Sequence, residues 1–157
     1  MKFTDFVCFE ATVPQLQSKD RDGVIAELAS ALGKVGRLGN SRGEEIAKAV
    51  IKREREASTG MGKGVAVPHV KHKAVKDIVA VIGQSSMGVD FSALDKQPVY
   101  TVILLVSPAD NPDKHLQAME NIFKYLQQEK FRKWLRQCQT AKQIEDLFKD
   151  ADEHQLL

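Results

Sequence analysis

Apolar side chains recur every three or four residues in two stretches of the first third of the chain, which predicts two helices there. The first helix begins at an N-cap supplied by Ser18 or Asp20 and stops at Gly36. The second helix begins at Ser41, which opens the capping-box sequence SRGE, and extends to about Glu56. This part of the chain therefore predicts a pair of helices before any strand.

Shorter apolar runs follow the helical pair, and their length is that of strands. The runs at 65–67, 78–83 and 99–106 predict three strands. The last run is almost continuously apolar, which favours a central strand that is buried on both faces. The segment 12–16 predicts an edge strand, because its proline cannot donate to a central ladder. Three glycines in 60–64 predict a flexible loop that leads into the strand at 65–67.

Helical spacing returns after the third strand. Asn111 and Pro112 suit the N-cap and the first helical position. The residues expected on the buried face of this helix are Leu116, Met119, Ile122, Phe123 and Leu126. A shorter helix is predicted around 131–138, and the capping box TAKQ at 140–143 opens the last helix. We expect the tail after Asp150 to fray.

The order of these elements decides the fold class. Helices come as a pair before the strands and as a cluster after them, which predicts an α/β fold (α+β in some schemes) in three layers, with a mixed sheet flanked by helices on both faces. The pattern lacks the strict alternation of a Rossmann fold. A chain of 157 residues has the length for one sizeable core, so we assign residues 1–157 to a single domain.

Composition and charge narrow the class of function. The longest apolar run is far shorter than a membrane span, and Asp5 and Glu10 interrupt the N-terminal stretch, so we expect a cytoplasmic protein without membrane insertion. A net charge of +2 is too small for a nucleic-acid-binding surface. Cys8 and Cys138 lie far apart without metal-ligand spacing. The glycines of 60–64 precede a strand, which does not fit a nucleotide-binding loop.

Three residues are candidates for chemistry, and each has a structural alternative. His69 follows a proline at the end of an apolar strand, where side chains reach a sheet edge; it is a reactive group or a structural histidine. His115 falls in the first turn of a helix, where it helps to bind an anion or is simply exposed. Arg53 clamps phosphoryl oxygens or belongs to a solvated face. His72, between two lysines, is expected at the surface rather than in a metal site.

Several linked motifs, together with the opening helix pattern, cover nearly the whole chain and resemble a known family. They are Arg53-Glu54, STG at 58–60, GKGVAVPH at 62–69, Phe91 with LDKQPV at 94–99, VILLV at 102–106, PAD at 108–110 and His115-Leu116. In this order they resemble the enzyme IIA domains of the phosphoenolpyruvate-dependent sugar phosphotransferase system, mannitol/fructose type, and their nitrogen-regulatory branch especially. The resemblance implies a mixed sheet between helical layers.

The resemblance also implies roles for the three candidates. The family's phosphorylated histidine falls on His69, its second active-site histidine on His115 and its active-site arginine on Arg53. The resemblance implies that a histidine phosphocarrier protein donates a phosphoryl group to His69 Nε2. A IIB-like or regulatory protein is the implied downstream target. His115 and Arg53 would stabilise the phosphate, and no cofactor or metal is expected. The protein is thus expected to be a phosphotransferase component with a phosphohistidine intermediate.

Two positions depart from the family pattern, and other functions stay open. Lys63 stands where the nitrogen-regulatory branch often has Asn, and Val70 where Gly commonly follows the histidine. Lys63 is expected to add phosphate attraction or alter partner choice, and Val70 to stiffen the chain. The main alternative is a regulatory protein-binding module of the same fold without onward transfer. A relative of the cytoplasmic domains of anion transporters is disfavoured, because all three candidate residues are present.

Overall fold

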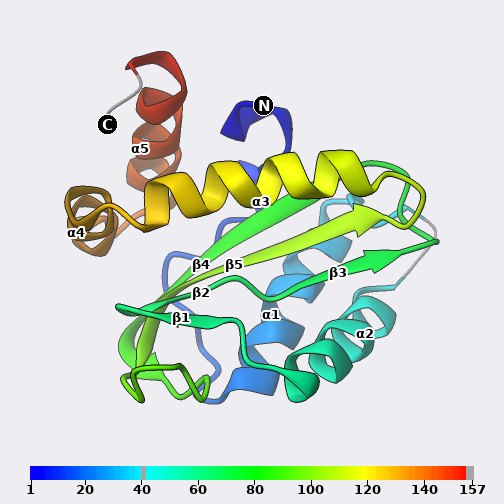
Figure 1. Cartoon of the computed structure of the whole chain (residues 1–157), viewed down its shortest axis with the longest axis horizontal. Helices are drawn as coiled ribbons and strands as arrows, with labels where there is room; N and C mark the ends of the chain where they lie inside the picture. Colours follow the sequence, from blue (N-terminus) through cyan, green and yellow to red (C-terminus); the bar gives the residue numbers. More distant parts are fainter. Residues whose placement is uncertain (40–41, 155–157) are drawn as a thin grey trace.

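The computed structural model describes residues 1–39 and 42–154, in which five strands form one sheet with β5 at its centre (Figure 1). The strands are β1 (Gly60–Gly62), β2 (Val65–Ala66), β3 (His69–His72), β4 (Val79–Val89) and β5 (Val99–Pro108). β4 pairs antiparallel with β5, and β2 and β3 pair parallel with it. β1 extends the sheet antiparallel to β2. The predicted mixed sheet and its central strand are confirmed.

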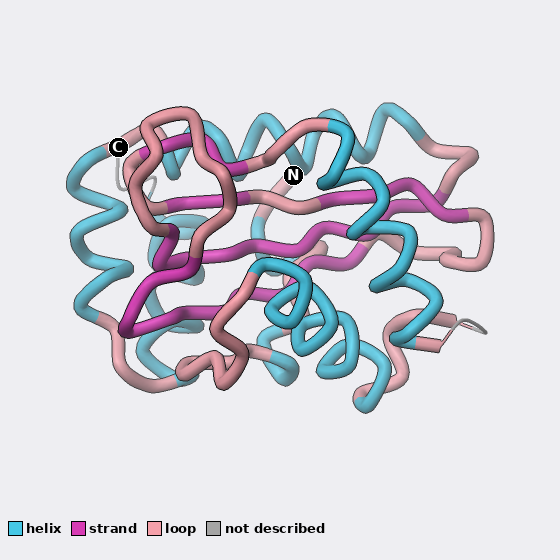
Figure 2. Tube along the Cα trace, turned by 90° about the horizontal axis from the view of Figure 1, so that it is seen from below, coloured by secondary structure: helices cyan, strands magenta, loops and turns pink. Residues whose placement is uncertain are grey.

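Helices cover both faces of the sheet, and Figure 2 shows them in front of and behind the strands. The α-helices are α1 (Arg21–Lys34), α2 (Gly43–Glu56), α3 (Pro112–Leu126), α4 (Glu129–Gln137) and α5 (Ala141–His154); the 3-10 helices η1 (Phe3–Asp5) and η2 (Phe9–Ala11) precede them. α1 and α2 pack on one face, and α3, α4 and α5 form the layer on the other. Among the described residues, no helix combines the length and apolar composition that a membrane span requires. The predicted three-layer α/β fold is confirmed.

Alternation along β5 builds two hydrophobic cores. Val102, Leu104 and Val106 pack against α1 and α2. Ile103 and Leu105 point to the opposite face and pack against α3 and its neighbours. Since successive side chains of a strand alternate between faces, a strand covered by helices on both sides must be apolar at every position. This requirement explains the unbroken apolar run that marked β5 in the sequence.

The segment 60–72 differs from the predicted loop followed by one strand. Its first glycines lie in β1, and the chain turns at 63–64 into β2. Pro68 separates β2 from β3, but its carbonyl accepts a hydrogen bond from Leu105 N at 3.0 Å. Both strands therefore follow the same edge of β5. His69 begins a strand rather than ending one, because the pairing with β5 continues past the proline.

The segment 12–16 runs beside β4 without being a strand, so the predicted edge strand is wrong. Val13 forms an isolated parallel bridge to Gly83, and Val13 N donates to Ile82 O at 3.0 Å. Gln84 N donates to Val13 O at 3.0 Å, and after Pro14 the next bond to β4 runs from Leu16 N to Gln84 O at 2.7 Å. The segment therefore contacts β4 through a few backbone hydrogen bonds without forming a regular ladder.

Side-chain caps start three helices as the sequence indicates. Asp20, Asn111 and Thr140 each accept a hydrogen bond from the backbone N–H three residues further on, at 2.6, 3.3 and 3.1 Å. The predicted cap at Ser41 lies outside the described residues, and Arg42 occupies the N-cap position of α2. Local hydrogen bonding therefore sets most of these helix starts.

The segment 151–154 is helical, so the predicted fraying directly after Asp150 is wrong; residues 155–157 lie outside the described residues. α5 continues to His154, and the carboxylate of Asp152 accepts hydrogen bonds from Phe3 N at 2.7 Å and Thr4 N at 3.0 Å. These two amides belong to the first turn of η1, where backbone N–H groups lack partners within the helix. Asp152 therefore ties the last helix to the N-terminal segment, a contact between residues that are distant in sequence.

The buried face of α3 is confirmed except at its first position. Ile122 and Leu126 are buried, and Met119 and Phe123 are partly buried and pack against the core. Leu116 is instead 58% exposed, and its neighbour His115 is buried. The prediction of Leu116 as a core residue is therefore wrong.

Candidate functional site

Two of the predicted site residues come together at one end of β5. β3 pairs in parallel with β5, and His69 lies opposite Leu105 in this ladder. β5 then leads through a short turn into α3, whose first turn carries His115. The two imidazole rings have their centroids 5.4 Å apart. The sheet register and the turn after β5 therefore join residues that are far apart in the sequence.

A backbone hydrogen bond fixes the tautomer of His69. Its Nδ1 lies 2.8 Å from the carbonyl oxygen of Val67. A carbonyl oxygen only accepts hydrogen bonds, so Nδ1 carries the proton and donates it. In the neutral ring, Nε2 then keeps a free lone pair and is the nucleophilic nitrogen. The residue before Pro68 thus sets which atom of His69 is available for reaction.

The surroundings of His69 also favour the neutral ring. Burial lowers its pKa, and the positive charges of Arg53 and Lys71 act in the same direction. The bond to the Val67 carbonyl and the charge of Glu54 oppose this shift. Because the net pKa shift is downward, the His69 ring is uncharged at neutral pH.

His115 is buried, which excludes the alternative of an exposed helix-start residue. Only 8% of it is exposed, and its Nδ1 lies 2.6 Å from Ser107 Oγ. Burial lowers the pKa of His115 to about 4, and the nearby His69 and Lys71 contribute to the shift. The ring is therefore neutral at physiological pH. It can donate a hydrogen bond to an anion beside His69, but it cannot supply a positive charge.

Arg53 supplies a cation from the opposite helical layer. It lies in the last turn of α2, is half-buried, and its Nη1 donates to Ala57 O at 3.2 Å. Its charge acts on His69, as the lowered pKa of that ring records. The guanidinium keeps further N–H donors for phosphate oxygens. The structure thus associates all three sequence-predicted residues with one site.

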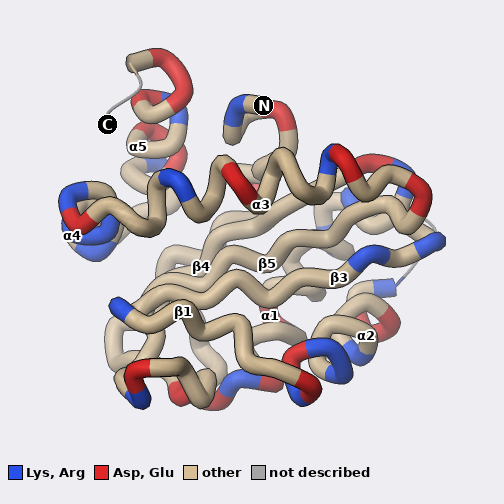
Figure 3. Tube along the Cα trace, viewed as in Figure 1, with Lys and Arg blue, Asp and Glu red and all other residues tan. Residues whose placement is uncertain are grey.

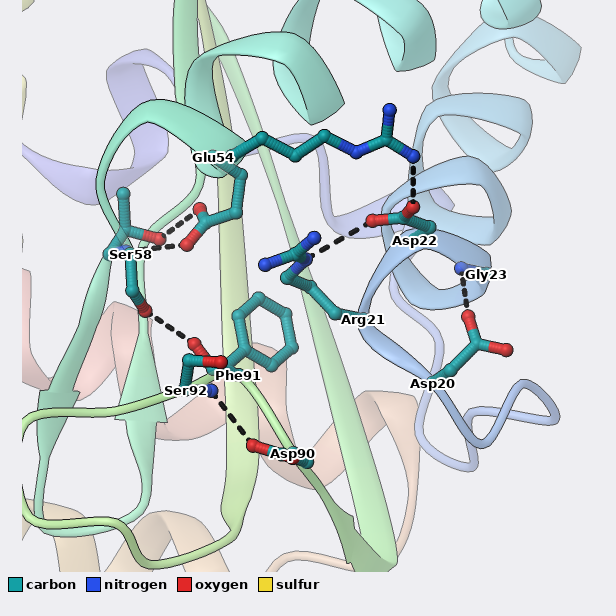
Figure 4. Close-up of polar contacts among 11 residues, drawn as sticks. Asp20, Arg21, Asp22, Gly23, Glu54, Ser58, Asp90, Phe91 and Ser92 are labelled. Atoms are coloured by element: carbon teal, nitrogen blue, oxygen red, sulfur yellow. Dashed lines mark hydrogen bonds and ion pairs between the residues drawn. The ribbon is translucent and has the colours of Figure 1, made fainter.

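Glu54 is a site-supporting residue that the sequence motif contained without revealing its role. It is 1% exposed, and its carboxylate accepts hydrogen bonds from Thr59 N at 2.5 Å and Thr59 Oγ1 at 2.6 Å. Thr59 O in turn accepts from Val67 N at 3.2 Å. Figure 4 shows the Glu54 carboxylate turned toward the segment of Ser58, whose hydroxyl donates to Phe91 O. These bonds join the end of α2 to the strand that leads to His69.

Lys71 is a further basic residue of the site that sequence reasoning treated only as surface charge. It is exposed and lies two residues after His69 on β3, so both side chains point to the same face of the sheet. Its charge acts on both His69 and His115. Basic positions follow the end of β3 in Figure 3. Positive charge therefore surrounds the two neutral rings, an arrangement that favours a bound anion.

His69 and His72 do not come together as a pair of metal ligands. His69 and His72 are three residues apart on β3, and side chains at this spacing point to opposite faces of a strand. His72 Nδ1 accepts a hydrogen bond from Ala74 N at 3.1 Å and so stabilises the turn after β3. Among the described residues, the last turn of α5 brings ligand atoms of the exposed Asp150, Glu153 and His154 within 4.8 Å of one another.

The structure describes both positions that depart from the family pattern. Lys63 has a φ of 60° between two glycines of positive φ, and its N–H donates to Asp95 Oδ2 at 2.8 Å. Asn tolerates this left-handed conformation better than Lys does, so nothing in the backbone explains the lysine. Val70 faces away from His69 and packs against the core beneath α1 and α2. The fold and the site together define an α/β protein in which two uncharged imidazole rings lie close together near basic side chains.

Comparison with known proteins gives the family. A family model described as "Phosphoenolpyruvate-dependent sugar phosphotransferase system, EIIA 2" matches residues 9–151, and the chain belongs to this family. It is 32% identical over 152 residues to the "PTS system fructose-specific EIIABC component" of Bacillus subtilis, a match that covers 97% of this chain and 24% of that protein. It is 31% identical over 144 residues to a "Nitrogen regulatory protein" of Bradyrhizobium diazoefficiens, which covers 92% of each. The chain thus spans about a quarter of the first relative and most of the second.

Solved structures have the same fold. The nitrogen regulatory protein IIA-Ntr from Neisseria meningitidis matches with a TM-score of 0.83 and 22% identity over 91% of this chain and 96% of that one. Enzyme IIA mannitol from Escherichia coli, in a complex with phosphorylated enzyme IIB mannitol, matches with a TM-score of 0.74 and 20% identity over 89% and 94%. At these identities the likeness supports the fold, and the site rests on the geometry described above.

Proposed function

We propose that this protein is a phosphocarrier that accepts a phosphoryl group on His69 Nε2 from a histidine phosphocarrier protein and passes it to a downstream protein. The observation that carries the proposal is the 2.8 Å hydrogen bond from His69 Nδ1 to the Val67 carbonyl. This bond leaves Nε2 unprotonated beside a second imidazole and a guanidinium. Membership in the EIIA 2 family supports the same reaction.

The transfer balances without any proton movement at His69. The N–P bond of the donor's phosphohistidine breaks, its ring keeps the bonding electron pair, and a new N–P bond forms from the lone pair of His69 Nε2. His69 Nδ1 retains its proton and its bond to Val67 O throughout. Phosphoryl transfer of this kind depends on positioning and charge stabilisation more than on acid–base chemistry. No cofactor is required.

Arg53 and His115 have complementary roles in this mechanism. The guanidinium of Arg53 neutralises charge on the phosphoryl oxygens, and Lys71 adds to the positive field. The neutral ring of His115 donates a hydrogen bond from a position 5.4 Å, centroid to centroid, from the His69 ring. Leu116, which is 58% exposed beside this ring, is suited to contact a partner protein.

The experiment that tests the proposal is the intact mass of the protein after incubation with phosphoenolpyruvate, enzyme I and the histidine phosphocarrier protein. We expect the wild type to gain one acid-labile phosphate and His69→Ala to gain none. His72→Ala is the matched control, because it removes the other histidine of β3 from the opposite face. Phosphate on the His69→Ala variant, or none on the wild type with either these donors or phosphoramidate, would refute the assignment.

A second function is favoured by the relative named as a nitrogen regulatory protein, which the chain matches over 92% of the length of each. In this case the protein is a binding module whose partner recognises only one phosphorylation state. A phosphate of about two negative charges beside Leu116 would change how a partner docks. Titration of a IIB-like domain with the phosphorylated and the unphosphorylated protein distinguishes the regulatory function from the carrier function. Binding without movement of the phosphate supports regulation, and appearance of phosphate on the partner supports a carrier.

A further inference from the structure

Ser107 is a buried polar residue at the end of an apolar row. On β5 it shares the α3-facing side with Ile103 and Leu105, and it is 0% exposed. A buried hydroxyl is costly unless it forms a hydrogen bond. Its Oγ lies 2.6 Å from His115 Nδ1, and among the described residues this ring nitrogen is the hydrogen-bond partner found for it. No sequence motif singles out this serine.

The pairing indicates which group donates. A hydroxyl has one proton to give and lone pairs with which to accept. If His115 Nδ1 were the donor, the proton of the Ser107 hydroxyl would be left without an acceptor in a buried site. If Ser107 donates to Nδ1, both groups are satisfied. The second arrangement is the one expected of a buried polar pair.

We infer that Ser107 is a positioning residue, whose hydroxyl donates to His115 Nδ1 and thereby holds the neutral His115 ring in the tautomer with its proton on Nε2. The two histidines of the site then have complementary forms. His69 is protonated at Nδ1 by its bond to Val67 O and offers a lone pair at Nε2. His115 accepts a hydrogen bond at Nδ1 from the Ser107 hydroxyl and offers an N–H at Nε2. One ring is prepared to attack phosphorus, and the other to donate to a phosphoryl oxygen.

The tautomer matters because His115 is uncharged. A protonated imidazole has two N–H groups, but a neutral one has a single N–H. Burial keeps this ring neutral, with a pKa of about 4, so its donor must stand on the correct nitrogen. The role of Ser107 in transfer rests on the proposed phosphocarrier function, whereas its effect on the tautomer does not.

The experiment is long-range ¹H–¹⁵N correlation NMR of the imidazole nitrogens, with the His115 signals identified by their loss in His115→Gln. In the wild type at neutral pH we expect Nε2 of His115 to be protonated and Nδ1 to be bare. In Ser107→Ala we expect a measurable fraction of the other tautomer. Phosphorylation of His69 in that variant should slow by about threefold to tenfold, the effect of one neutral hydrogen bond.

Thr101→Val is the matched control. Thr101 lies on the same face of β5, is 1% exposed, and its hydroxyl donates to Gln84 Oε1 at 2.9 Å, away from the histidines. This variant also loses a buried hydroxyl, so it should lose stability while keeping the His115 tautomer and the transfer rate. A general packing defect would instead change both variants alike, and that result would overturn the inference.

Two other outcomes would also overturn it. One is a wild-type His115 that carries its proton on Nδ1. The other is a Ser107→Ala variant with the wild-type tautomer and rate. If the wild type accepts no phosphate but the tautomer shifts as expected in Ser107→Ala, the phosphocarrier proposal fails and the assignment of the Ser107 hydrogen bond stands.

Discussion

Acidification should destabilise this protein through the buried ring of His115. In the folded state burial lowers the pKa of His115 from 6.5 to about 4, whereas in the unfolded chain the ring has its ordinary value. Between these two values the unfolded state binds more protons than the folded state. The free energy of unfolding therefore falls as the pH falls through this window, and this contribution is complete below about pH 4.

The magnitude follows from the size of the shift. A difference from 6.5 to about 4 corresponds to about 3 kcal/mol, at roughly 1.4 kcal/mol for each pH unit. The ring lies close to the protein surface, beside the half-buried His69, so water screens part of this penalty. We therefore expect a loss of about 1–2 kcal/mol from His115. The lowered pKa of His69 adds to it in the same direction.

The assay is urea unfolding of the wild type and His115→Gln between about pH 7 and about pH 4.5. Glutamine does not titrate, so the variant should show a shallower dependence of unfolding free energy on pH, whatever its stability at neutral pH. The difference between the two slopes isolates the His115 contribution from that of the carboxylates. Equal slopes would show that the ring is as easily protonated in the folded protein as in the unfolded chain, which would refute the reasoning.

Three further predictions concern the site and its support. Arg53→Ala should slow phosphorylation of His69 by about tenfold to a hundredfold, as measured by the time course of the mass gain. The control variant Arg55→Ala removes an exposed cation and should keep the wild-type rate. Equal rates in the two variants would show that the Arg53 guanidinium has no role in the transfer. Glu54→Ala should lower the free energy of unfolding by about 2–4 kcal/mol, because it leaves the backbone N–H and the hydroxyl of Thr59 without their acceptor. A loss below about 0.5 kcal/mol would contradict this account. Lys63→Asn should raise the free energy of unfolding by about 0.5–1 kcal/mol, because Asn tolerates a φ of 60° better than Lys does. A destabilised variant would show that contacts of the lysine side chain outweigh its backbone strain.

Most of the fold was predictable because its determinants are local. The caps at Asp20, Asn111 and Thr140 form bonds within one helical turn, and they mark helix starts whatever surrounds them. The apolar run of β5 records burial on both faces. The errors came where a partner distant in sequence decides the structure. α5 extends past Asp150 because the Asp152 carboxylate accepts hydrogen bonds from two backbone amides of η1.

The candidate site was predicted in part. His69, His115 and Arg53 were recognisable from their motifs and from the resemblance to the IIA family. The role of Glu54 could not be predicted from the motif, because its hydrogen bonds to Thr59 form only where the end of α2 lies beside the start of β1. On the buried face of α3 one residue was misjudged, because apolar spacing favoured Leu116 over its polar neighbour His115.

By itself, the sequence determined the helices, the central strand and the mixed three-layer arrangement. These properties depend on hydrogen bonds and apolar periodicity within short segments. Only the tertiary structure decided that His69 Nε2 is the free nitrogen, that His115 is buried and neutral, and that Ser107 lies against it. Protonation states depend on burial and on partners from other elements, which the parallel pairing of β3 with β5 brings together.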